Sequence, residues 1–112
     1  MAAARDLRLP PHWFQILLAL ADSERHGLGI MQEVFDRTGG NMRLWPGMLY
    51  RNLRRLEDEG LIADSRRPGP PESGSPHYFH ITPAGRQICA AEARRLEGFV
   101  EAARAKKLLG RT

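Results

Sequence analysis

Two arginines on one side of a predicted helix are the residues of this chain best suited to bind another molecule. In the stretch 46–60, three leucines fall within about 60° of one another at 100° per residue and form a narrow apolar stripe, namely Leu49, Leu53 and Leu56. Opposite that stripe lie Gly47, Arg51 and Arg54, with Tyr50 at one flank. Guanidinium groups bind phosphates and guanine edges through paired hydrogen bonds, and free N–H groups at a helix N-terminus suit a phosphate. Because the acids of this stretch gather in its last turn, the pattern predicts a helix that enters a DNA major groove by its N-terminal half.

The same residues also fit a helix face that only contacts water. In that interpretation Arg54 pairs with Asp58 and Arg55 pairs with Glu59, one helical turn apart. Of the 17 basic residues 15 are arginines, which fits phosphate binding and fits the codon usage of a GC-rich genome equally well. The net charge of +4 arises after residue 82, so it does not by itself decide between the two interpretations.

Three helices are expected before residue 61, after a mobile N-terminal arm over residues 1–9. The first starts at Pro10-Pro11 and carries apolar residues at helical spacing: Trp13, Ile16, Leu17 and Leu20. The second covers about residues 26–38, with Gly29 predicting a closely packed neighbour, and ends at Gly39-Gly40. The third begins at Pro46 and ends at Gly60.

A hairpin and a long helix are expected to complete the chain. Residues 61–67 and 77–82 read as two strands joined by the sequence PGPPESGSP, with Arg66 and Arg67 at the base of the loop. Helix–helix–helix–hairpin is the order of a winged helix-turn-helix. The fold class is therefore predicted as mainly α with a small β-hairpin, a winged helix-turn-helix over 10–82 followed by a long C-terminal helix within 83–112.

The last helix is predicted to run from Pro83 to about Leu109. It would be about 40 Å long at 1.5 Å per residue, too long to bury its apolar side against so small a body. That side carries five residues at a spacing typical of helix pairing: Cys89, Leu96, Phe99, Val100 and Ala103. A helix from a second copy of the chain would cover them, so a homodimer is expected.

Several segments together resemble the PadR family of bacterial transcriptional regulators. They are His26-Gly27, Thr38-Gly39-Gly40, the run LWPGMLYRNLRRLEDEGLI at 44–62 and the run YFHITPAG at 78–85. The resemblance covers about residues 12–105 and is most specific at 46–62. It implies a homodimeric winged-helix repressor that binds a double-stranded DNA operator. The two-fold axis of such a dimer predicts a palindromic operator, and a cytoplasmic protein is expected because neither a secretory signal nor a membrane span is recognised. The single C-terminal helix resembles the short subgroup of the family.

The resemblance also implies roles for individual residues. The third helix, about 46–60, would be the recognition helix, and the hairpin, about 61–82, would be the wing. The residues that would face DNA are Pro46, Gly47, Tyr50, Arg51 and Arg54, with Arg66 and Arg67 on the wing. The last helix would form the dimer interface and pack on the partner's first helix, which adds Trp13 and Leu17 to that interface.

Two positions depart from the family pattern, and one ligand site follows from it. Trp45 stands where the family usually has serine and Met48 where it usually has threonine, so two polar contacts to DNA are missing. Some relatives bind flat aromatic molecules at the dimer centre. Here a small aromatic effector would contact Trp13, Leu17, Phe99 and Val100, unless these side chains simply fill the interface.

Other classes of protein find little support in the sequence. The 112 residues suffice for one domain, and the longest apolar run, Ile16 to Ala21, is far too short to cross a bilayer. No secretory signal is recognised at the start. A single cysteine excludes an intramolecular disulfide, and no metal, cofactor or catalytic motif is found, so no enzyme activity is expected. The alternative to a DNA-binding regulator is a protein-interaction or small-molecule-binding module without operator binding.

Overall fold

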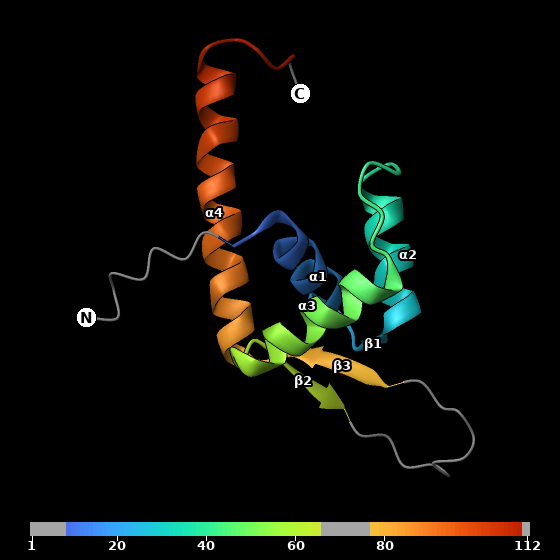
Figure 1. Cartoon of the computed structure of the whole chain (residues 1–112). Coiled ribbons are helices and arrows are strands. Elements are labelled where there is room, and N and C mark those ends of the chain that lie inside the picture. Colours follow the sequence, from blue (N-terminus) through green and yellow to red (C-terminus); the bar gives the residue numbers. More distant parts are fainter. Residues whose placement is uncertain (1–8, 66–76, 111–112) are drawn as a thin grey trace.

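The computed structural model describes residues 9–65 and 77–110, in which a small sheet lies at one edge of a group of four helices (Figure 1). In chain order the elements are α1 Pro11–Ala21, β1 Arg25–His26, α2 Gly27–Arg37, α3 Pro46–Asp58, β2 Ile62–Ser65, β3 Tyr78–Ile81 and α4 Pro83–Ala105. The predicted fold class, mainly α with a small β element, is confirmed. Within the described residues, no helix combines the length and the apolar character needed to cross a membrane.

Proline and side-chain caps set the starts of the helices. A proline occupies the first turn of α1, α3 and α4, where a missing N–H group costs little. Two helices also have side-chain caps, since His26 Nδ1 accepts a hydrogen bond from the Gly29 N–H and Thr82 Oγ1 accepts one from the Gly85 N–H, each at 3.1 Å. The predicted starts of α1, α3 and α4 are therefore confirmed.

The sheet has three strands, although the sequence predicted two. Its order is β1-β3-β2, with both pairs antiparallel. The missed strand, β1, consists of Arg25 and His26 and pairs with Phe79 and Tyr78 of β3. Two residues are too few to show an alternating pattern, so β1 exists only because the turn after α1 lies beside β3. The loop between β2 and β3 lies outside the described residues.

The core is built from one face of each of the first three helices together with the sheet. The leucine stripe predicted for α3 is completely buried, and Ile16, Leu17 and Leu20 of α1 lie against the same core. Leu9 is also buried, although the sequence placed it at the end of a mobile arm.

Two glycines allow close approach of neighbouring elements, but Gly29 is not one of them. A Cβ atom added at Gly29 would meet its neighbours at ordinary contact distances, so that prediction is wrong. At Gly27 an added Cβ would lie 2.8 Å from Cζ of Tyr50, so this glycine lets α3 pack on the start of α2. At Gly85 it would collide with the backbone carbonyl of Leu61, so α4 also depends on a glycine for its packing.

Helix α4 packs on the body of the subunit through its first half only. Its buried residues are Gly85, Cys89 and Glu92, and the later part stands away from the other elements (Figure 1). The helix ends at Ala105, earlier than the predicted Leu109, and Lys107 adopts a left-handed conformation with φ 62°. The predicted boundary was wrong because no glycine or proline marks this end.

Candidate nucleic-acid interface

Helix α3 presents its two central arginines to solvent. The side opposite the buried leucines is exposed, and it carries Arg51 and Arg54. Among the described residues, neither guanidinium forms a hydrogen bond or an ion pair, and the expected pair between Arg54 and Asp58 is absent. Arg55 lies over the ring of Trp13, with its guanidinium carbon 5.8 Å from the ring centroid. Two of the three arginines of α3 are therefore free to contact an anion.

The N-terminus of α3 is open in the way the sequence predicted. Its N-cap residue, Trp45, makes no side-chain capping bond, Pro46 has no N–H, and the first turn contains no acid. Apart from its chain neighbours and its own helix backbone, the described residue that a Cβ added at Gly47 would meet is Arg51, with Nη1 at 3.8 Å. The partial positive charge of the helix end therefore remains uncompensated beside an arginine.

Tyr50 combines an exposed position with a packing role. The side chain is half exposed, as a DNA-facing residue requires. Its phenol ring also fills the space that the missing side chain of Gly27 leaves on α2. Tyr50 therefore helps fix the angle between α2 and α3, a role that the sequence pattern did not show.

Trp13 is bound to α3 of its own chain. Its indole Nε1–H donates a hydrogen bond of 2.9 Å to Oδ1 of Asn52, and Nδ2 of Asn52 donates one of 2.8 Å to the carbonyl of Met48. The sequence analysis missed Asn52, because an asparagine within a helix carries no signal that it is bonded to a distant tryptophan. The pair fixes the start of α1 to the middle of α3.

Two of the residues predicted for the dimer interface lie inside the subunit. Leu17 has no exposed surface, and Cys89 is only 6% exposed. Burial raises the pKa of the Cys89 thiol, and the charge of Glu92 raises it further. Neither side chain can reach a second copy, so neither fits an interface or a ligand pocket between copies. Both were misplaced because helical spacing does not distinguish a side buried by the chain itself from a side buried by a partner.

Four of the other predicted interface residues lie on the part of α4 that stands away from the body, whereas Trp13 lies on α1 and is half-buried. Phe99 is 60% exposed and Val100 is 42% exposed, while Leu96 and Ala103 are half-buried. Their spacing places all four on one side of the helix. Arg95 donates two hydrogen bonds to the carboxylate of Glu92, at 3.0 and 2.6 Å. Its guanidinium carbon lies 5.3 Å from the ring centroid of Phe99.

The wing is described only at its two strands. Arg66 and Arg67 lie outside the described residues. In the described part of the hairpin, Nδ1 of His77 is 3.0 Å from a carboxylate oxygen of Asp64. In the described part of the chain, no three histidine, cysteine, aspartate or glutamate side chains gather as a metal site would require.

The comparisons with known proteins agree with this winged-helix architecture. The sequence model of the transcriptional regulator PadR-like family matches residues 16–91. The transcriptional regulator Rv3488 of Mycobacterium tuberculosis is 38% identical over 82 residues, which cover 73% of this chain and 72% of that protein. A crystal structure of a PadR family transcription regulator from Clostridium difficile matches with a TM-score of 0.72 at 20% identity, over 90% of this chain and 100% of that one.

One relative is much longer than this chain. An uncharacterized 37.1 kDa protein in transposon TN4556 of Streptomyces fradiae is 41% identical over 88 residues, which cover 76% of this chain but only 24% of that protein. The fold is that of a winged-helix protein. The extent of the family match shows that the chain belongs to the PadR family of transcriptional regulators. Membership of this family confirms the prediction of a transcription factor rather than an enzyme.

Proposed function

We propose that the chain is a homodimeric, sequence-specific DNA-binding repressor that acts in the cytoplasm on a palindromic operator. The observation that carries the proposal is the pair Arg51 and Arg54, exposed on α3 without an acidic partner among the described residues. In this role α3 enters the major groove, and the two arginines bind guanine edges. Pro46, Gly47 and Tyr50 bring the start of α3 close to the DNA.

Phosphate contacts would position the protein without reading sequence. The open N-terminus of α3 supports one such contact. Arg66 and Arg67, at the base of the wing, would supply the others. Contacts of this kind add affinity for any DNA and make binding depend on salt.

The exposed side of α4 supports the homodimer. Leu96, Phe99, Val100 and Ala103 form an apolar side that the chain's own described residues leave largely uncovered. Pairing of two such helices would bury it and would relate the two recognition helices by a two-fold axis. Half-sites would then lie about 34–36 Å apart, one turn of DNA.

A small aromatic effector remains part of the proposal, with a changed set of residues. Leu17 is buried in the core and is removed from the site. Trp13, Phe99 and Val100 keep accessible surface and would line a pocket between the copies, or would fill the interface themselves. Because Trp13 is hydrogen-bonded to Asn52, a ligand that moves its ring would act on α3 directly.

The test is a footprint of the protein on the DNA upstream of its own gene, with affinity measured by fluorescence anisotropy. The expected result is one protected palindromic site, bound by a dimer, with half-sites one helical turn apart. Absence of any protected site at low salt would contradict the proposal. It would favour the second candidate, a protein-interaction or small-molecule-binding module without operator binding. Trp45 supports that candidate, because this exposed N-cap residue stands where the family usually has serine.

A further inference from the structure

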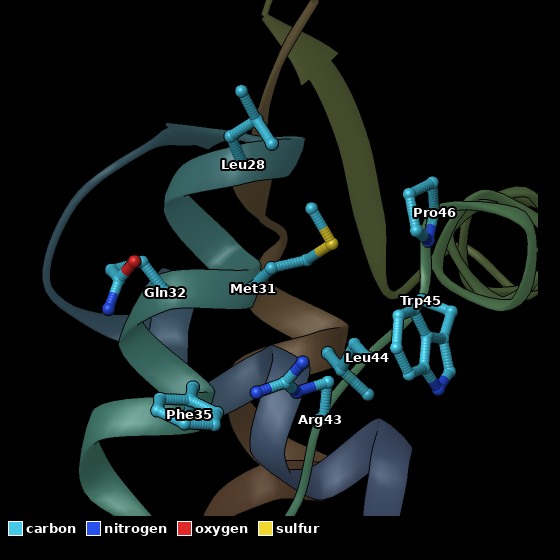
Figure 2. Close-up of a pocket in the computed structure, with 8 residues that line it drawn as sticks. All are labelled: Leu28, Met31, Gln32, Phe35, Arg43, Leu44, Trp45 and Pro46. Carbon is cyan, nitrogen blue, oxygen red and sulfur yellow. The ribbon is translucent and has the colours of Figure 1, made fainter. Parts of the chain in front are cut away.

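A groove between α2 and the segment that leads into α3 provides a site outside the proposed dimer interface. It has a volume of about 520 Å³, within the range of roughly 300–1,000 Å³ that is typical of small-molecule sites. Most of its lining is apolar. Figure 2 shows the side chains of α2 on one side of the groove and those of the segment on the other. The lining residues are Leu28, Met31, Gln32, Phe35, Arg43, Leu44, Trp45 and Pro46. Two of these apolar side chains are unusually exposed, Leu28 at 67% and Trp45 at 60%.

Arg43 places a positive charge in this apolar groove. Its guanidinium carbon lies 5.1 Å from the ring centroid of Phe35 and 5.5 Å from that of Trp45. The two rings hold the guanidinium by cation–π interactions that leave its N–H donors unused. No carboxylate among the described residues pairs with it, whereas Arg25 and Arg37 each have an acidic partner.

We infer that this groove binds a small organic anion, a carboxylate attached to an apolar body. The carboxylate would accept paired hydrogen bonds from Arg43, and the apolar body would contact Leu28, Met31 and Trp45. The apolar lining of the groove favours such a ligand over a DNA phosphate, because a phosphate gains no binding energy from contact with apolar side chains. The positive charge of Arg43 disfavours a neutral ligand, because its guanidinium would lose bound water without gaining a hydrogen-bond partner.

Occupation of the groove would interfere with DNA binding, a consequence that rests on the proposed function. Trp45 is the N-cap residue of α3 and Pro46 is its first residue, so a ligand in contact with both lies against the start of the recognition helix. A bound anion would also repel the phosphates that approach this helix end. The ligand would therefore act as an inducer from within the DNA-binding domain, separate from the dimer centre.

The test uses 2-naphthoate as the probe and 2-naphthamide as its neutral analogue, with the full chain and without DNA. Calorimetry is expected to show that naphthoate binds at least about tenfold more tightly than the amide. Arg43→Gln and Leu28→Asp, both at exposed positions, should each weaken naphthoate about tenfold or more, whereas Arg94→Gln, an exposed arginine of α4, should change nothing. In NMR spectra the indole N–H signal of Trp45 should shift and that of Trp13 should stay in place.

Other outcomes would overturn the inference. Naphthoate affinity that survives both Arg43→Gln and Leu28→Asp, or a shift confined to Trp13, would place the probe elsewhere. Weaker binding of Arg43→Gln to every DNA sequence, with naphthoate unaffected, would identify Arg43 as a phosphate contact instead. Naphthoate that binds as expected but does not displace operator DNA would refute the inducer role. Naphthoate binding by a chain that binds no DNA would support the site and reject the proposed function.

Discussion

The hydrogen bond between Trp13 and Asn52 can be tested by a double-mutant cycle. The two side chains connect the start of α1 to α3, 39 positions apart in the sequence. Trp13→Phe removes the N–H donor and keeps an aromatic ring under Arg55. Asn52→Leu removes the acceptor, and with it the bond from Nδ2 to the carbonyl of Met48.

The expected magnitude follows from the geometry of this contact. A partly buried bond of 2.9 Å contributes about 0.5–1.5 kcal/mol net, and an acceptor left without a partner adds to the loss. Trp13→Phe should therefore lower the free energy of unfolding by about 1–2 kcal/mol. Asn52→Leu should cost a similar amount, because it removes both bonds of Asn52 and the higher helix propensity of leucine offsets only part of that loss. The double variant should be more stable than the sum of the two losses implies, by about 1 kcal/mol.

The assay is urea unfolding of all four proteins at one chain concentration, because dimer stability depends on concentration. Trp45→Phe is the matched control, because this exposed indole makes no side-chain capping bond to α3 and its loss should cost less than about 0.5 kcal/mol. The variants at Trp13 and Asn52 should also bind operator DNA more weakly than the wild type, because both lose the contact between these two side chains. A coupling energy near zero would refute the claim that this contact positions α3.

Three further predictions follow from packing and burial. Gly85→Ala should lower the free energy of unfolding by about 1–3 kcal/mol, because its methyl group collides with the carbonyl of Leu61 and the side chain of Ile81, whereas Gly98→Ala, with no described atom near it, should stabilise the helix by about 0.5–1 kcal/mol. Because the pKa of Cys89 is raised in the folded chain, the thiol ionises at lower pH in the unfolded chain. The free energy of unfolding should therefore fall as pH rises above the ordinary thiol pKa of about 8.5, and Cys89→Ala should abolish that fall. A pH-independent difference in stability between the wild type and Cys89→Ala would contradict the burial of the thiol. Phe99→Glu should shift the chain from dimer to monomer in light scattering, while Leu108→Glu, beyond the end of α4, should not; an unchanged dimer in the first would refute the proposed interface.

Local rules predicted most of the elements because proline and glycine mark their ends. Pro46 opens α3 as expected, and Gly60 closes it in a left-handed conformation with φ 77°. The leucine stripe predicted the buried face of α3, since a single helix with a narrow apolar side has only one way to pack on a core. The positions of the residues around the helix also predicted that Arg51 and Arg54 face solvent.

Contacts between distant segments could not be predicted in this way. Strand β1 exists only through its pairing with β3, and Asn52 acquires its role only when α1 crosses α3. Leu17 and Cys89 lie on apolar helix sides, as expected, but the fold decides that the subunit itself covers them. Trp45 was recognised as an unusual residue, while its contact with Arg43 across a groove required the structure.

The central claim is that Arg51 and Arg54 read the operator sequence. The most direct measurement is the ratio of affinities for the operator and for a scrambled duplex at fixed salt, compared between the wild type and Arg51→Ala/Arg54→Ala, with Arg94→Ala as the control. Each bidentate contact to a base contributes about 1–3 kcal/mol of discrimination. The double variant should therefore lose most of this ratio while it keeps its affinity for scrambled DNA within a few-fold, and the control should match the wild type. An unchanged ratio in the double variant would contradict the assignment of α3 as the recognition helix.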